Sequence, residues 1–272
     1  MFPSFRIAIP SYRRGIMLPL YTLKTLERHG FPKDLIDIFV IQDEYQNYKQ
    51  HLEINPYYKN LIVGVPGLAA QRQFIKDYYP LDKEIFFCDD DLNNFKLFPN
   101  SLSLPQIVSY MFLLMKAEGI HLGGFYPTNS LLFMNDRIIK GKVYIVGAAY
   151  LHINTKETDT IEDEKEDVQR SCYWIKKDGA VLRCESVGIS TKYLKNPGGL
   201  QMIRTSQSIQ EAAERVYKMY PDLLYAPAEK KKGKPDAYWD CKFLKAPKIT
   251  LSLPTFHSES SNLEHQDSPY QD

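Results

Sequence analysis

Short apolar runs alternate with helical periodicity along roughly the first ninety residues of the chain. The runs predict four strands: Arg6–Pro10, Asp37–Ile41, Leu61–Val65 and Ile85–Cys88. The segments between them carry apolar residues at helical spacing and predict three helices: Leu18–His29, Tyr45–Leu52 and Ala69–Tyr79. Strands that alternate with helices in this way predict an α/β fold with a parallel sheet.

The pattern after residue 100 is less regular. It predicts three helices: Ser103–Glu118, Glu166 to about Ile175, and Ser208–Met219. It predicts strands at Leu131–Met134 and Lys142–Ile153, a glycine- and aromatic-rich loop at Gly123–Asn129, and a turn at Lys177–Gly179 that leads into Ala180–Glu185. We expect one domain over residues 1–250, with halves at 1–100 and 101–250, and a flexible polar, acidic tail at 251–272.

The composition is that of an ordinary globular protein. Of 272 residues, 44% are hydrophobic and 25% charged, and the net charge of +1 predicts no particular partner. The four cysteines are scattered without a CxxC pair, so we expect reduced thiols and no zinc site. The sequence shows no secretory leader and no apolar stretch of membrane-spanning length, which predicts a cytoplasmic protein with no membrane partner.

Three adjacent carboxylates, Asp89, Asp90 and Asp91, follow directly after the apolar run Ile85–Cys88. Ligands of open α/β sheets bind in the crevice at the carboxyl ends of the strands. Adjacent carboxylates repel one another unless a cation lies among them, and hard oxygen ligands suit Mg²⁺ or Mn²⁺. The alternative is a solvated acidic turn.

Other polar residues follow the neighbouring predicted strands. Because the carboxyl ends of parallel strands share one edge of the sheet, we expect these residues to meet the acids in one crevice. They are Ser11, Tyr12, Arg13, Asp43 and Arg72, with Pro10 ending the first strand. The arginines suit phosphate groups, and the alternative for each is a solvated surface position. Arg72 has the stronger case, because it follows a glycine turn at the start of a predicted helix.

These residue types favour a nucleotide diphosphosugar as ligand. Such a donor needs a cation or basic groups on its diphosphate and an acid or base near the anomeric carbon. Asp89 and Asp91, two apart on an extended chain, can share one metal ion that stabilises the departing nucleotide. A second acidic pair, Glu166 and Asp167, offers a general base for the acceptor hydroxyl, or simply caps a helix.

The order of these motifs resembles a known family, the TET-associated, base-J-type glycosyltransferases of phages, large DNA viruses and some eukaryotes. The resemblance covers roughly residues 6–205. It rests on short motifs in order: Ile9–Arg13, Thr25-Leu26 with Gly30, Phe39-Val40 with Tyr48, Gly67 with Gln71-Arg72, Asp89–Asp91, Lys165–Val168, Lys177–Gly179, Arg183 and Gly198-Gly199.

The resemblance implies a GT-A-like fold with a mixed, mainly parallel central sheet flanked by helices. It implies that Asp89 and Asp91 hold Mn²⁺ or Mg²⁺, and that Glu166 and Asp167 lie near the acceptor. The residues implied to bind the donor, with UDP-glucose preferred, are Pro10, Ser11, Tyr12, Arg13 and Arg72, to which we add Asp43 and Asp90. Many GT-A enzymes complete the metal shell with a late histidine, for which His257 is the candidate here. The family's usual arginine–asparagine pair is Arg72-Gln73 in this chain.

The implied acceptor is a 5-hydroxymethylpyrimidine in DNA, in the host cytoplasm if a phage encodes the protein. A rim of lysines would hold phosphates, and Tyr126, Tyr193 or Trp174 would stack on an extruded base. The lysines are Lys140, Lys142, Lys192, Lys195 and the run Lys230–Lys234. The alternatives are a polysaccharide or small-molecule acceptor, a catalytically silent GT-A-like binding domain, and a nucleotidyltransferase.

Overall fold

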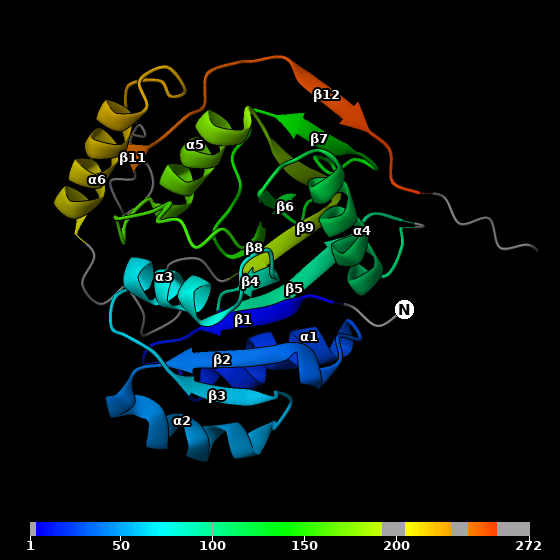
Figure 1. Cartoon of the computed structure of the whole chain (residues 1–272), viewed down its shortest axis with the longest axis vertical. Helices are drawn as coiled ribbons and strands as arrows, with labels where there is room; N and C mark the ends of the chain where they lie inside the picture. Colours follow the sequence, from blue (N-terminus) through cyan, green and yellow to red (C-terminus); the bar gives the residue numbers. More distant parts are fainter. Residues whose placement is uncertain (1–3, 100, 192–204, 230–238, 255–272) are drawn as a thin grey trace, which may run out of the picture.

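The computed structural model describes residues 4–99, 101–191, 205–229 and 239–254. Ten strands of this part form one mixed sheet (Figure 1). They are β1 Arg6–Pro10, β2 Ile36–Val40, β3 Asn60–Val63, β4 Glu84–Cys88, β5 Leu92–Leu97, β6 Leu122–Tyr126, β7 Ile138–Gly141, β8 Ala149–Ile153, β9 Val181–Thr191 and β12 Lys248–Leu251. Their order is β12-β7-β9-β6-β8-β4-β1-β2-β3, with β5 paired to β9.

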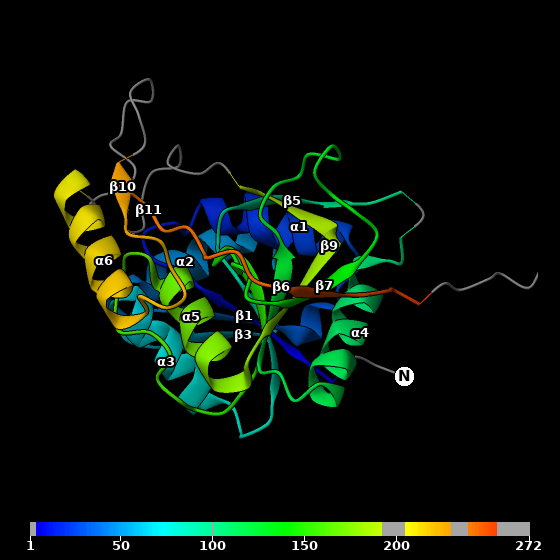
Figure 2. The same ribbon diagram turned by 90° about the horizontal axis from the view of Figure 1, so that it is seen from above.

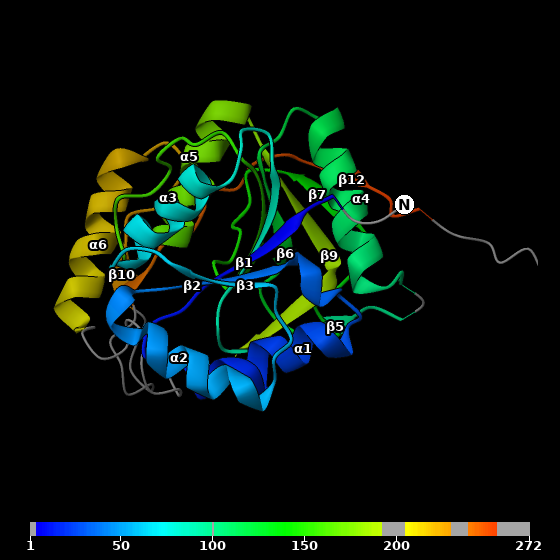
Figure 3. The ribbon, with the colours of Figure 1, turned by 60° about the horizontal axis from the view of Figure 1, so that its bottom comes forward.

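Helices cover both faces of the sheet (Figure 3). The helices α1 Lys24–Arg28, α2 Tyr45–His51 and α4 Leu104–Ala117 pack against one apolar core. A second core lies under α3 Leu68–Tyr78, α5 Glu166–Asp178 and α6 Ser206–Met219. The short strands β10 Ala228–Glu229 and β11 Trp239–Asp240 pair with each other beside α6.

Strand periodicity explains the two cores. Side chains alternate across a strand, so Ile7 and Ile9 of β1 enter the first core while Ala8 enters the second. The four strands β3, β2, β1 and β4 are mutually parallel, and β8 joins β4 to the rest of the sheet in antiparallel pairing. The expected α/β fold with a mixed sheet and flanking helices is confirmed.

The glycine-rich stretch predicted as a loop at Gly123–Asn129 is in large part the buried strand β6. A methyl group on Gly123 would lie 2.7 Å from Met115 Sδ, and one on Gly124 would lie 2.5 Å from Ile145 Cγ2. The glycines therefore let helix α4 and the segment before β8 press against the two faces of the strand. That prediction was wrong because the constraint comes from residues distant in sequence.

Two further predictions were wrong in part. Residues 131–134, predicted as a strand, form a turn whose Leu132 side chain is 90% exposed. The strand predicted at Lys142–Ile153 contains only β8, because residues 142–148 leave the sheet and line a cavity described below. Strands β5, β7 and β12 were not predicted.

No helix in the described part of the chain is long and apolar enough to span a membrane. The division of the chain at residues 100 and 250 remains a prediction. The sheet takes strands from both proposed halves, and its last strand, β12, extends to Leu251.

A buried ion pair ties α3 to the segment before α5. Lys76 Nζ lies 2.8 Å from a carboxylate oxygen of Asp159, whose other oxygen accepts a 2.8 Å hydrogen bond from Trp174 Nε1. Burial lowers the pKa of Lys76. Burial acts to raise the pKa of Asp159, but the charges of Lys76 and Arg170 outweigh it and lower that pKa to about 2.

Asp159→Asn should destabilise the protein by about 3–5 kcal/mol, because it leaves the buried Lys76 ammonium without its anion. The matched control is Asp222→Asn, which breaks the Lys176–Asp222 pair, where both side chains are about half exposed. We expect the control to leave the stability nearly unchanged, because a solvent-exposed ion pair contributes little to folding. Urea unfolding at neutral pH measures both values.

The sign of the pH dependence follows from the lowered pKa of Asp159. Its contribution is complete above the unfolded pKa near 4 and is lost as pH falls through about 2. The difference in stability between wild type and Asp159→Asn should therefore shrink in that window. A constant difference from neutral pH to pH 2 would contradict this assignment.

Candidate active site

A cavity of about 1230 Å³ opens at the carboxyl ends of β1 and β4. The parallel register pairs Ala8 with Phe87, which brings the polar residues after both strands to the same edge. Ten of the predicted site residues line this cavity: Pro10, Ser11, Tyr12, Arg13, Arg72, Asp89, Asp90, Asp91, Glu166 and Asp167. Asp43 does not line it and is exposed on the 3₁₀ turn Gln42–Glu44, and His257 lies outside the described residues.

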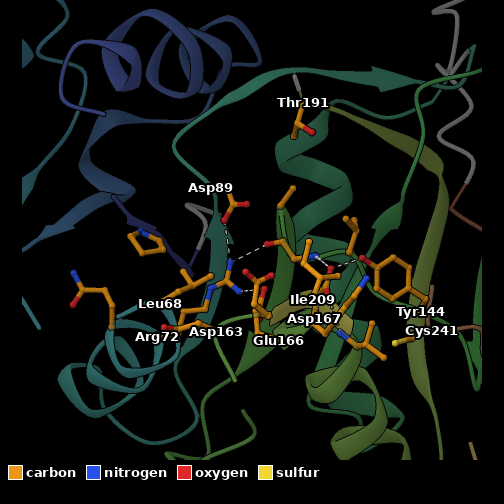
Figure 4. A pocket seen from close by; sticks show the side chains of 18 of the residues that line it. Leu68, Arg72, Asp89, Tyr144, Asp163, Glu166, Asp167, Thr191, Ile209 and Cys241 are labelled. Atoms are coloured by element: carbon orange, nitrogen blue, oxygen red, sulfur yellow. Dashed lines mark hydrogen bonds and ion pairs between the residues drawn. The ribbon is translucent and has the colours of Figure 1, made fainter. Parts of the chain in front are cut away.

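Figure 4 shows where the lining residues lie around the cavity. Asp89 and Arg72 lie at one end, Tyr144 and Cys241 lie at the other, and Asp167 lies between them. The site therefore combines the residue that follows β4 and a residue of α3 with residues from the second half of the chain.

Asp90 and Asp91 are held by an arginine that the sequence analysis did not select. Arg14 Nη1 lies 2.7 Å from Asp90 and 3.0 Å from Asp91, and all three side chains are nearly buried. Ser11 Oγ donates to Asp90 at 2.5 Å and lies 2.6 Å from the Tyr48 hydroxyl. Burial raises the pKa of Asp90, and Arg14 opposes that rise. The positive charge of Arg14 thus offsets part of the repulsion between Asp90 and Asp91.

Asp89 is the acid most open to the cavity, with 34% of its side chain exposed. Arg72 Nη2 donates to its carboxylate at 2.9 Å. Burial raises the pKa of Asp89 to about 6, although the charge of Arg72 lowers it. An additional cation near this carboxylate would favour its ionised form.

Arg72 connects Asp89 to the second acidic pair. It lies in the second turn of α3, which begins after Gly67 with φ +89°, a conformation that glycine adopts without strain. Its guanidinium donates to the Gly147 carbonyl oxygen at 3.2 Å, forms an ion pair with Glu166, and lies over the ring of Tyr150.

Glu166 and Asp167 have different surroundings despite being neighbours. Glu166 is buried and forms ion pairs with both Arg72 and Arg170, so its carboxylate is occupied. Asp167 is half-buried at the cavity, accepts a hydrogen bond from the Tyr144 hydroxyl, and lies 3.4 Å from the Gly147 amide. Of the pair, Asp167 is the better placed to meet a ligand.

Gly147 makes this arrangement possible. A methyl group at this position would lie 2.4 Å from Glu166 Oε1 and 3.1 Å from Asp167 Cβ. The start of α5 therefore packs directly on the backbone of the segment before β8. That contact brings Asp167 into the same cavity as the acids that follow β4.

No three His, Cys, Asp or Glu side chains within the described ranges are grouped so that they could hold a metal ion by themselves. Two carboxylates and the oxygens of a diphosphate would be an ordinary ligand set for Mg²⁺ or Mn²⁺. The Asp89 carboxylate, which is partly exposed to the cavity, fits such a shared site. Asp91 would contribute once its contact with Arg14 is loosened or shared.

The fold is shared with solved glycosyltransferases of the GT-A type. Glucosyl-3-phosphoglycerate synthase from Mycobacterium tuberculosis, crystallised with Mn²⁺, UDP and phosphoglyceric acid, matches at TM-score 0.51 and 10% identity, over 91% of this chain and 89% of that chain. Its complex with Mg²⁺ and UDP gives the same values. S. aureus TarS 1–349 matches at 0.47 and 10% identity, over 80% and 73%. No family model and no curated protein matches the sequence.

Asp89→Asn should keep or slightly raise the melting temperature, because a carboxylate with a raised pKa is costly to keep ionised in the folded protein. It should weaken Mn²⁺-dependent UDP binding by at least the ~10–100-fold that the loss of an outer-shell metal partner costs. Calorimetric titration of UDP with Mn²⁺ measures this effect. Asp43→Asn, outside the cavity, is the control, and equal binding by both variants would remove Asp89 from the donor site.

Proposed function

We propose that this protein is a metal-dependent glycosyltransferase that moves a sugar from a nucleotide diphosphosugar, with UDP-glucose preferred, to a 5-hydroxymethylpyrimidine in DNA. One observation carries the proposal. The acids that follow β4 and the separately positioned Asp167 lie in one cavity, at the carboxyl edge of a GT-A sheet. The UDP and metal ions in the matching synthase structures support the donor.

The donor would occupy the end of the cavity at Asp89. Asp89 and Asp91 would hold the metal ion, which as a Lewis acid supplies charge stabilisation to the diphosphate. Arg13 lines the cavity with a side chain that is 53% exposed and whose Nε lies 3.8 Å from a Glu44 carboxylate oxygen, and it would offer a phosphate contact. Arg72 balances the charge of Asp89 and holds it in place.

The acceptor hydroxyl would meet Asp167. In a single in-line displacement, the hydroxyl oxygen forms the bond to the anomeric carbon as the bond from that carbon to the diphosphate breaks. The hydroxyl proton passes to the Asp167 carboxylate and the nucleoside diphosphate departs. Tyr144 would orient Asp167 through its hydrogen bond, whereas Glu166 fixes Arg72 and Arg170 and takes no part in proton transfer.

DNA as acceptor draws support from the family resemblance and from Lys142, which lines the cavity. The structure argues against three of the residues that the sequence analysis assigned to DNA binding. Lys140 is paired with Glu118, and Trp174 is fully buried and cannot stack on a base. Tyr126 lies beside Arg183 and does not line the cavity. The remaining candidates, Lys192, Tyr193, Lys195 and Lys230–Lys234, lie outside the described residues.

The acceptor is tested by intact mass of a short duplex that carries one 5-hydroxymethyluracil or 5-hydroxymethylcytosine. We expect a gain of one hexosyl unit after incubation with UDP-glucose, Mn²⁺ and the protein. The unmodified duplex is the control and should gain nothing. The proposal of a DNA acceptor would be wrong if the duplex gains no mass with any UDP-sugar while a polysaccharide or small-molecule acceptor causes release of UDP.

Asp167→Asn should lower the transfer rate by about 10²–10⁴-fold, the usual contribution of a positioned general base, with little change in melting temperature. Glu166→Gln should instead lower the melting temperature, because two buried arginines lose an anion. Initial rates and thermal unfolding of the two variants separate the roles. If Asp167→Asn retains the full rate, another group is the base.

A further inference from the structure

The far wall of the cavity is formed by residues 241–248, which we name the basic strap. One end is hydrogen-bonded to the segment after α6, from Tyr225 N to the Lys242 carbonyl oxygen and from Leu244 N to the Leu223 carbonyl oxygen, both at 2.8 Å. The other end enters β12, where Lys248 pairs with Gly141 of β7. Figure 2 shows this segment, in orange, running between α6 and the edge of the sheet. Its backbone is therefore fixed at both ends.

Three lysines of the basic strap, Lys242, Lys245 and Lys248, line the cavity and are exposed. Lys142, which follows β7, lines the same cavity. Within the part of the chain that the structure describes, the three strap ammonium groups form no ion pair with a carboxylate. The arginines beside Asp89, Asp90 and Asp91 do form such pairs. Among the described residues, carboxylates therefore neutralise the cations at the Asp89 end of the cavity but not the lysines of the basic strap.

Aromatic side chains lie next to these lysines. Phe243 of the basic strap has its ring centroid 6.3 Å from that of Tyr144, at an interplanar angle of 38°. Tyr144 is also the residue that donates its hydroxyl hydrogen to Asp167. Tyr225, half-exposed, lines the same cavity. A ligand held by the basic strap would thus have flat apolar surfaces between it and the proposed base.

We propose that the basic strap binds the phosphodiester backbone of the DNA acceptor. Lys142 extends the surface, and Tyr144 and Phe243 flank the path of the extruded base toward Asp167. This inference rests on the proposed function, and it names the part of the protein that recognises the acceptor. None of these strap residues was singled out from the sequence.

The spacing of the strap lysines favours a polymer over a small phosphorylated acceptor. Consecutive strap lysines are three residues apart, so their backbones lie up to about 10 Å from each other. A single phosphate would meet only part of such a row, whereas a DNA strand presents a phosphate about every 3.4 Å of helix axis. Contacts of this kind release counterions and make binding strongly dependent on salt.

The test is a triple variant, Lys242→Gln, Lys245→Gln and Lys248→Gln, compared with Lys24→Gln, Lys33→Gln and Lys49→Gln. The control removes the same charge from exposed lysines that do not line the cavity. Fluorescence anisotropy of a labelled short DNA measures binding between about 50 and 200 mM salt. We expect the strap variant to reduce the slope of log K against log salt by about 2 to 3, and the control to leave it unchanged.

The second readout is transfer to two acceptors. With a hydroxymethylated oligonucleotide, the strap variant should raise KM with little change in kcat. With the free 5-hydroxymethyl-2′-deoxyuridine nucleoside, which has no phosphate, it should match wild type. Equal salt slopes for strap variant and control, or a wild type that binds no DNA at the lowest salt, would overturn the strap proposal. A strap-dependent DNA affinity without transfer from any UDP-sugar would instead overturn the proposed function and leave the strap proposal in place.

Discussion

Three neighbouring carboxylates at the end of a buried strand are the constraint on which the site depends. Asp89, Asp90 and Asp91 repel one another, and burial raises the pKa of Asp89 and of Asp90. Arg14 balances two of them from the loop after β1, and Arg72 balances the third from α3. Because Arg72 is also paired with Glu166, the charge balance of the strand end reaches the start of α5. The positions of four separate segments are therefore coupled through one set of ion pairs.

The mixed sheet gives this coupling a geometric basis. The parallel strands β1 and β4 bring polar loops to one edge, and the antiparallel β8 beside β4 begins at that same edge. The segment before β8 therefore passes close to the acids, and Asp89 N donates to the Ala148 carbonyl oxygen at 2.8 Å. Gly147 in this segment leaves the room that Glu166 and Asp167 occupy. A parallel strand beside β4 would have carried this segment to the opposite edge of the sheet.

Local pattern was sufficient to predict the strands β1, β2 and β4 and the acids after β4, because a continuous apolar run and the residue that ends it are adjacent in sequence. It was insufficient where the deciding contact is distant. Gly123 and Gly124 resemble a loop until Met115 and Ile145 are placed against them. Arg13 and Arg14 are chemically equivalent in the sequence, and the three-dimensional structure is needed to show that Arg14 is the one that pairs with the acids. The basic strap could not be predicted, since its lysines meet the cavity through the pairing of β12 with β7 and through hydrogen bonds to the segment after α6, which no local pattern reveals.

The position of β12 at the sheet edge has a consequence for the order in which the cavity can form during synthesis. The strands β1 to β4 and the helices between them lie within the first 88 residues, so they leave the ribosome before the rest of the sheet has been translated. The strap wall cannot exist until β12, which ends at Leu251, has left the ribosome and paired with β7. The segments that form the acid-lined end, which extend to the start of α5, are therefore synthesised before the basic strap that completes the cavity. The edge strand β7 of the nascent chain would stay open to other chains during that interval.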